Sequence, residues 1–522
     1  MRHHRVLGLL VAVALFLAAC GGSTSGGSQS NTPKQGGTLT VAIGIDADTL
    51  DPMAQTTTTI GQIVQMVAEP LVNYNAQGKL IPVLATSWTS SSNGLEYTFT
   101  LRKGVKFQDG EPFNAQAVKF SMDRLLSPNT FKAQPSVLRV IKSTTVVDDS
   151  HVRITLSSPF SPFVSAMTSA DIIAPNSVTQ HGNTPAKVVW PVGTGPYAYA
   201  GRVMSDHITL QRFDGYWGKK PAYKTQIYKI VPEAATREAL VKSGQAQVIY
   251  QPPANDLPAL EHASDVHAIL GPDDRTIQII INNQDPNAPL LKNPQVRQAL
   301  NYAVDKNAII KNVQFGAATA VTAPLSQALF GACNVGSYAY NPTKAKQMLQ
   351  QAGAAGMSLK LMSPQGRYTG DYDTAQAVAN YLRAVGLKVT VPNPSDWPTY
   401  VSTINVAPSR ASTDLHLLGW APSYLDASGA LIQFQQSNWP PAGLATSYYE
   451  NPQVDQLVSK AESESSSAQR RKDYCAAEKI VWQAAPWIFL YNPKNPIVTT
   501  TTVKGVYGLP NEQFITTWAT PA

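Results

Sequence analysis

The residue types that most often carry catalysis do not occur at their usual spacing in this chain. No Gly-x-Ser-x-Gly, His-Glu-x-x-His or Cys-x-x-Cys motif is found, and there is no phosphate-binding loop. Gly193 to Ala198 matches the glycine spacing of dinucleotide sites. However, Pro196 and the alternating residues after it predict a turn entering a strand, whereas a dinucleotide site needs a helix N-terminus there. We therefore expect neither an enzyme nor a cofactor site.

The eight histidines and the adjacent carboxylates are dispersed along the sequence. His262 and His267 are five positions apart, unlike the i, i+4 pairs that bind metals, which favours a solvated surface. His416 lies in an apolar strand and is typical of a hydrogen-bonded structural residue. Asp273-Asp274 is interpreted as a turn, because sequence neighbours seldom converge on one reacting atom. No metal site is predicted.

The first twenty residues predict export and lipid attachment. Met1 to Arg5 is basic, and Val6 to Leu17 is an apolar run of 12 residues, shorter than the ~20 that span a bilayer. Leu17 to Cys20 is similar to a bacterial lipobox, although an ordinary signal peptide ending near a cysteine would look alike. We expect residues 1–19 to be removed, which places the protein in the periplasm or on the outer face of the cell membrane.

The three cysteines have different expected roles. Cys20 is predicted to carry the lipid, so that residues 20–36, which hold no large apolar side chain, form a flexible tether to the membrane. Cys333 and Cys475 would lie on the oxidising side of the membrane, where disulfides persist. The sequence allows either a disulfide between them or two unpaired buried thiols.

Length and composition indicate a large soluble body. The chain of 522 residues is long enough for about three or four compact units. Hydrophobic residues make up 43% of it and charged residues 14%, with a formal net charge of +7. No cluster of lysine and arginine with interleaved aromatic residues occurs, so neither nucleic acid nor a polybasic membrane contact is expected.

The periodicity of the sequence predicts an α/β lobe at each end with a mixed insert in the first. A β-branched strand over 38–45 precedes a helical stretch over 59–71. Helical and strand-like segments then alternate between residues 342 and 418, which favours a parallel sheet, and a long helical region follows over 452–484. Two α/β lobes imply a cleft between them, where ligands bind.

Several long segments resemble one family. Leu84 to Trp88 and Leu95 to Phe113 are similar to the bacterial family 5 extracellular solute-binding proteins, and three later segments agree in order: Gly193 to Tyr197, Asn293 to Lys306, and Gly419-Trp420. The resemblance covers essentially the whole chain after the tether.

The resemblance implies an α/β fold of the type II periplasmic-binding-protein class, a two-lobed clamshell with an extra mixed subdomain in the first lobe. The expected boundaries are lobe I over 37–74, 191–274 and 495–522, the inserted subdomain over 75–190, and lobe II over 275–494.

The implied function is that of the substrate-binding component of an ABC importer, a monomer that delivers a peptide or peptide-like ligand to a permease and ATPase complex. Three alternatives stay open: a non-peptide ligand such as a metal chelate, haem or glycoside; a clamshell sensor without transport; and an envelope enzyme on the same scaffold.

The same resemblance marks the ligand site. Trp397, Trp420 and the following Tyr424 match or adjoin aromatic positions of the family pocket, although core packing would also explain them. Oligopeptide binders of the family hold the peptide amino group with an Asp where this chain has Ser423, and Asp426 is the nearest substitute unless it caps a helix near residue 428. The amides of Asn282 and Asn283 are further candidates, at the second crossover between the lobes.

Overall fold

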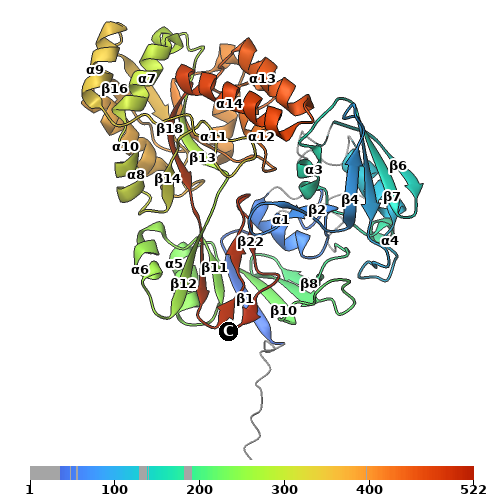
Figure 1. Cartoon of the computed structure of the whole chain (residues 1–522). Coiled ribbons are helices and arrows are strands. Elements are labelled where there is room, and N and C mark those ends of the chain that lie inside the picture. Colours follow the sequence, from blue (N-terminus) through green and yellow to red (C-terminus); the bar gives the residue numbers. More distant parts are fainter. Residues whose placement is uncertain are drawn as a thin grey trace, which may run out of the picture. The chain divides into compact units, whose positions relative to one another are not determined.

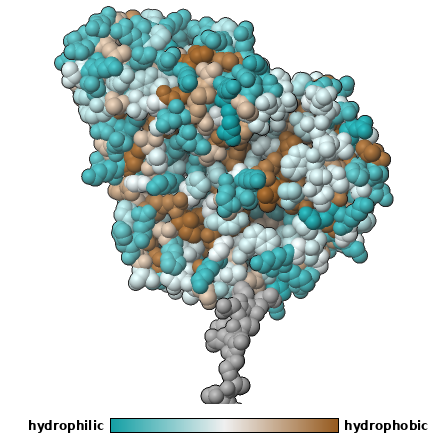
Figure 2. Space-filling view, viewed as in Figure 1, coloured by the Kyte–Doolittle hydropathy of each residue, from teal (hydrophilic) through white to brown (hydrophobic). Residues whose placement is uncertain are grey.

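The computed structural model describes residues 36–522 except 48, 55–56, 128–137, 139, 182–190 and 396. The predicted signal peptide, Cys20 and the tether up to residue 35 lie outside the described residues. The fold is that of the compact unit Lys34–Ala522. None of the helices in its described part is long and apolar enough to cross a membrane. Hydrophilic and weakly polar residues cover most of the face shown in Figure 2, with smaller hydrophobic areas between them.

A seven-stranded mixed sheet forms one lobe. Its order is β12-β19-β11-β1-β10-β9-β8, with bounds Val266–Gly271, Asn495–Thr500, Val248–Tyr250, Thr38–Ile43, Thr225–Ile230, His207–Arg212 and Tyr197–Val203. Helices α1 (Thr58–Gln65), α5 (Ala234–Lys242) and α6 (Leu257–Glu261) pack on it. Thr57 begins α1, since its side chain accepts the amide hydrogen of Ile60.

A four-stranded antiparallel sheet lies between the first and second parts of that lobe in the sequence. Its order is β4-β5-β7-β6, with bounds Ala85–Ser90, Glu96–Leu101, His151–Leu156 and Ile141–Asp148. Strand β5 alternates buried Tyr97, Phe99 and Leu101 with partly exposed residues, as its sequence predicts. Three helices belong to the same part of the fold as this sheet: α2 (Ala115–Leu125), α3 (Phe163–Ala166) and α4 (Pro175–His181). The short hairpin β2–β3 (Val72–Tyr74, Leu80–Pro82) precedes the sheet in the chain.

A six-stranded sheet forms the other lobe. Its order is β14-β18-β13-β17-β15-β16, with bounds Ala318–Ala320, Trp487–Pro493, Thr276–Ile281, Leu415–Trp420, Ser358–Met362 and Lys388–Thr390. Helices α7 (Pro294–Ala303), α9 (Pro342–Gln351) and α10 (Asp371–Ala384) cover one face (Figure 1). Helices α11 (Trp397–Ile404), α12 (Ala427–Leu431), α13 (Pro452–Ser463) and α14 (Ser467–Ala484) cover the other. Successive strand residues alternate between the two cores, because Ile279 packs with the first set and Ile280 with the second.

The strand directions correct one prediction. The alternation over 342–418 favoured a parallel sheet, and β15 does pair in parallel with β16 and β17. The centre of the sheet is antiparallel, however, because β13 pairs antiparallel with both β17 and β18. Those pairings join strands more than 130 positions apart, and local periodicity carries no information about their direction.

The chain passes twice between the two large sheets. It leaves β12 at Gly271 and enters β13 at Thr276, and it returns from β18, which ends at Pro493, to β19, which begins at Asn495. Both passages use the same end of the six-stranded sheet, which we call the crossover end. The opposite end, where β13 stops at Ile281, we call the distal end.

Candidate functional site

The crossover end gathers loops that are distant in sequence. Trp420, the last residue of β17, stands opposite Thr276 at the start of β13. The loop after β15 runs to the same end, where the Tyr368 hydroxyl donates to the carbonyl of Gly419 at 3.1 Å. Gly419 itself has no room for a side chain, since a Cβ would lie 2.8 Å from the Tyr368 ring. Both passages to the other lobe leave from this end, so it is the end of the six-stranded sheet that is directed toward the other lobe.

An aromatic and cationic surface lies there. The ring of Trp397 stacks on that of Tyr400, with the ring centroids 5.9 Å apart, and meets the ring of Tyr368 edge-on, with the centroids 6.0 Å apart. The exposed guanidinium of Arg367 lies 5.1 Å from the Trp397 centroid and 4.9 Å from that of Tyr368. Among the described residues Arg367 forms no salt bridge. This surface therefore offers a fixed aromatic wall and an unpaired positive charge.

Trp420 ends β17 at the same end of the sheet, and a hydrogen bond fixes its ring. It is half-buried, and its indole N–H donates to the carbonyl of Gly429 at 2.9 Å. With its only donor used, the ring can contribute an apolar face but no hydrogen bond. Ser423, three residues later, is exposed, and its carbonyl accepts a hydrogen bond from the Ser169 hydroxyl at 3.3 Å.

The first passage between the lobes is strongly charged. Arg275 and Glu512 form a two-pronged ion pair, and burial together with the Glu512 charge raises the pKa of Asp273 to about 8. Burial, followed by the charges of Asp273 and Glu512, raises the pKa of Asp274 well above its ordinary range. Both carboxyl oxygens of Asp274 are buried and have no hydrogen-bond partner in the described structure. Asp273-Asp274, interpreted from the sequence as a turn, instead forms a buried link between β12 and β13, and the Asp274 amide donates to the carbonyl of Pro510 in the C-terminal segment at 2.6 Å.

Two predicted ligand residues are corrected by their burial. Asp426 does not offer a free carboxylate, because it caps α12 through the amide of Ser428 and pairs with Arg470 at 2.5 Å. It is 3% exposed. Tyr424 is also buried: its hydroxyl lies 3.0 Å from that of Ser428, and its ring packs edge-on against Phe160 at 6.2 Å. The capping alternative for Asp426 was therefore the better one.

Asn282 and Asn283 were placed at the wrong end of the lobe. They follow the last residue of β13 and so lie at the distal end, not at a crossover. The Asn282 amide donates to the carbonyl of Thr413 at 3.2 Å, and the Asn283 amide donates to that of Ser447 at 3.0 Å. Both are buried, and their amides hold distal loops together.

His416 is structural, as predicted. It is buried in β17, and its Nε2 lies 2.8 Å from the hydroxyl of Thr446. Burial lowers its pKa to about 3, so the ring is neutral at physiological pH. No group of three or more potential metal ligands is found in the described part of the chain.

Gly193 to Gly195 form a turn that passes close to the end of α1. A Cβ at Gly193 would lie 2.1 Å from the carbonyl oxygen of Val67, and a Cβ at Gly195 would lie 2.3 Å from that of Met66. Only glycine therefore fits at these two positions. Strand β8 begins two residues later, which confirms the turn entering a strand. Thr194, between the two glycines, donates to the buried carboxylate of Glu69 at 3.0 Å. The turn thus packs directly against the backbone at the end of α1.

Cys333 and Cys475 are joined in a disulfide, with their Cα atoms 5.6 Å apart. The bond ties the loop between β14 and α9 to helix α14. It lies on the face of the sheet covered by α11 to α14.

Arg367 and Tyr368 were missed in the sequence. Their signal was positional, because they fall in the Gly- and Ser-containing loop that follows the predicted strand over 358–362, and ligand contacts cluster at such strand ends. No motif marks them, and their meeting with Trp397 depends on tertiary structure.

Comparison with known proteins agrees with this architecture. Residues 79–441 match the family of bacterial extracellular solute-binding proteins, family 5 Middle. The glutathione-binding protein GsiB of Pectobacterium atrosepticum is 33% identical over 484 residues, which cover 91% of this chain and 92% of that protein.

Solved structures share the fold. HbpA2 from Haemophilus parasuis has a TM-score of 0.82 at 25% identity, over 93% of this chain and 100% of that one. DppA from Helicobacter pylori, in complex with the peptide STSA, has a TM-score of 0.78 at 24% identity, over 94% and 98% of the two chains. The predicted two-lobed, type II clamshell is thereby confirmed. The chain belongs to the bacterial extracellular solute-binding proteins of family 5.

Proposed function

We propose that this protein captures a short peptide with free carboxylates, of the glutathione class, between its two lobes and delivers it to the permease and ATPase of an ABC importer. The observation that carries the ligand class is Arg367, an exposed guanidinium without a salt bridge that is held over Trp397 and Tyr368 at the crossover end. A guanidinium recognises a carboxylate through two parallel hydrogen bonds.

The amino-terminal side of the ligand has weaker support. Ser423 carries no charge, and the carboxylate of Asp426 is used by Arg470 and Ser428. A ligand whose carboxylates outweigh its single amine, as in glutathione, suits such a site better than a basic peptide. GsiB of Pectobacterium atrosepticum, which is named as a glutathione-binding protein, supports the same class.

The rest of the proposal concerns location and chemistry. We infer that Cys20 carries the lipid, that residues 20–36 tether the body to the outer face of the membrane, and that the protein acts as a monomer which releases its ligand unchanged. If Cys20→Ser still fractionates wholly with membranes, the lipid anchor is refuted.

Calorimetric titration of the mature protein tests the ligand class. Glutathione is expected to bind saturably, and Arg367→Gln is expected to weaken that binding by roughly 10–150-fold, the worth of a charged hydrogen bond of about 1.5–3 kcal/mol. Arg410→Gln is the matched control, because Arg410 is an exposed arginine in the same lobe that precedes β17 at the distal end. Trp420→Ala should weaken binding as well.

Two results would contradict the proposal. Saturable binding of a glycoside, haem or a metal chelate, with none of glutathione or other short peptides, would reject the ligand class. Equal affinities of the Arg367→Gln and Arg410→Gln proteins would reject the placement of the site.

A further inference from the structure

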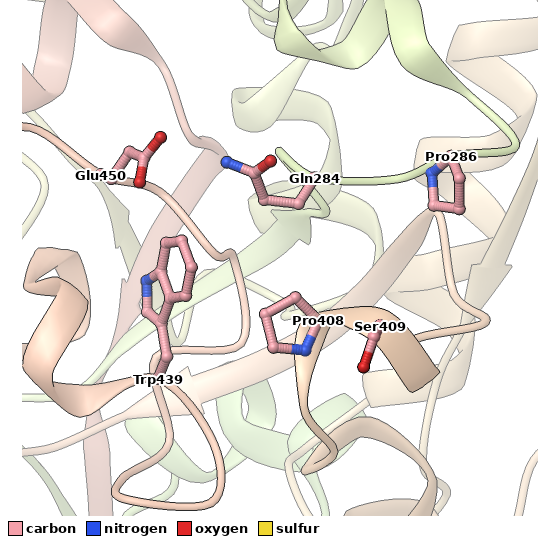
Figure 3. A pocket seen from close by; sticks show the side chains of 6 residues that line it. All are labelled: Gln284, Pro286, Pro408, Ser409, Trp439 and Glu450. Atoms are coloured by element: carbon pink, nitrogen blue, oxygen red, sulfur yellow. The ribbon is translucent and has the colours of Figure 1, made fainter.

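A pocket lies at the distal end of the six-stranded sheet. It has a volume of about 380 Å³ and is lined by Gln284, Pro286, Pro408, Ser409, Trp439 and Glu450 (Figure 3). The first two follow the end of β13, the next two precede β17, and the last two flank the loop that includes residues 440–449. Strands of six residues separate it from the crossover end by roughly 20 Å. It is therefore distinct from the site between the lobes.

The walls of this pocket are fixed by hydrogen bonds to the sheet. The loop that follows Trp439 is bound to β17 through Thr446 and His416, at 2.8 Å, and to Asn283 through the carbonyl of Ser447, at 3.0 Å. The Tyr448 hydroxyl donates to the carbonyl of Val406 at 2.7 Å, which joins this loop to the segment that holds Pro408. A pocket with fixed walls loses little conformational entropy when it binds a ligand.

Trp439 presents a ring without a free donor. Its indole N–H donates to the carbonyl of Tyr449 at 3.1 Å, and its ring stands perpendicular to that of Tyr448 at 5.9 Å. The side chain is half-buried. What remains for a ligand is the electron-rich face of the indole, the aromatic surface to which cations bind best.

Glu450 supplies a negative charge on the same side of the pocket (Figure 3). Its carboxylate is exposed and accepts one long hydrogen bond, from the Gln436 amide at 3.4 Å. Within the described ranges no lysine, arginine or histidine pairs with it. Arg410 follows Ser409 in the chain but does not line the pocket. The lining thus combines an unpaired carboxylate with an indole face and two rigid proline rings.

We propose that this distal pocket binds a small organic cation, an alkylated ammonium or a guanidinium group. The apolar substituents of such a cation contact Trp439, Pro286 and Pro408, its charge lies near Glu450, and Gln284 and Ser409 accept hydrogen bonds from any N–H group it carries. An anion is repelled by Glu450, and a neutral ligand gains neither the charge nor the cation–π attraction. The proposal does not depend on the identity of the ligand between the lobes.

Fluorine NMR of the mature protein labelled with 5-fluorotryptophan tests the proposal. Trp439→Phe identifies the Trp439 resonance among those of the nine tryptophans. Choline is expected to shift that resonance saturably and to leave the Trp420 resonance in place. Its neutral isostere 3,3-dimethyl-1-butanol should bind at least tenfold more weakly. N-acetyl-arginine amide is the second cation to be tested. If it binds more tightly than choline, the group that the pocket recognises is a guanidinium of a peptide or of a partner protein.

Glu450→Gln is expected to weaken choline binding about three- to tenfold, whereas Glu464→Gln, at a partly exposed acid elsewhere in the same lobe, should leave it unchanged. Both substitutions are at the surface and keep the fold. Equal binding of choline and its neutral isostere, or a Glu450→Gln protein with unaltered choline affinity, would overturn the proposal.

Discussion

Arg275 and Glu512 join the two large sheets at the first passage between them. Nη2 of Arg275 donates to Oε2 of Glu512 at 2.7 Å, and its Nε donates to Oε1. Arg275 directly precedes β13 of the six-stranded sheet. Glu512 belongs to the C-terminal segment, where the nearby Phe514 stacks on Tyr250 of the seven-stranded sheet at 4.5 Å. The ion pair therefore connects the two lobes at the region about which they would move.

Glu512→Gln is expected to lower the free energy of unfolding by about 3 kcal/mol, because it leaves the largely buried guanidinium of Arg275 without its counter-charge. The double replacement Arg275→Met with Glu512→Leu should recover most of this loss. Urea unfolding measures both.

Asp123→Asn is the control for that pair, since Lys119 and Asp123 form an exposed pair worth less than about 1 kcal/mol. If Glu512→Gln lowers the free energy of unfolding no more than Asp123→Asn does, the bridging role of Glu512 is wrong.

Stability should depend on pH through the neighbouring acids. The raised pKa of Asp273, about 8 instead of 3.8, means that the native protein binds more protons than the unfolded chain between these values. Stability from this pair of acids therefore falls as pH rises from about 4 to 8, and Asp274 acts in the same direction. The pKa of Glu512 is lowered, so its contribution to stability is lost as pH falls, and this happens only at more acidic pH.

Asp274→Asn isolates this effect, because it resembles the protonated acid in shape and cannot ionise. The variant should match the native protein in melting temperature near pH 5 and exceed it near pH 9. Other buried acids, such as Glu478, are common to both proteins and cancel in the comparison. Asp265→Asn, at an exposed position, should leave the pH profile unchanged. Parallel profiles for the native and Asp274→Asn proteins would contradict the assignment.

Much of the architecture could be predicted from sequence because local sequence patterns determine it. The alternation of Tyr97, Phe99 and Leu101 predicts one buried face of β5, and Asn114 predicts the start of α2 by capping it. The long helical region over 452–484 was predicted as one, whereas the structure divides it into α13 and α14 at Glu464 to Ser466, where Ser466 caps the second helix.

The site was less predictable because its residues acquire their roles from distant partners. Asp273 and Asp274 have the local signature of a turn, and only the C-terminal segment, more than 230 positions later, buries them. Asn282 and Asn283 likewise depend on Thr413 and Ser447. Trp397 and Trp420 were expected at the ligand site from the family resemblance. Both lie at the crossover end, and their contact with a ligand stays a prediction.

Glu69 should be a stability centre of the first lobe. Its carboxylate accepts hydrogen bonds from Thr194 at 3.0 Å, from the Tyr216 hydroxyl at 2.8 Å and from the Trp217 indole at 2.9 Å. Glu69→Ala removes the acceptor of three donors, two of them buried, and should cost roughly 3 kcal/mol of unfolding free energy. Urea unfolding checks the value, with the exposed Glu261→Ala as control. A loss below about 1 kcal/mol would mean that water satisfies these donors.

The disulfide should stabilise the second lobe without contributing to ligand recognition. Cys333 and Cys475 are 142 positions apart, so the bond restricts a long loop in the unfolded chain, for which about 2–4 kcal/mol is typical. The Cys333→Ser, Cys475→Ser double variant should melt at a lower temperature than the native protein and should not respond to a reductant, whereas the native protein should. Its affinity for the ligand held between the lobes should be unchanged, because neither cysteine belongs to the surface formed by Arg367, Tyr368 and Trp397. A reductant that leaves the melting temperature of the native protein unaltered would show that the bond contributes nothing to stability.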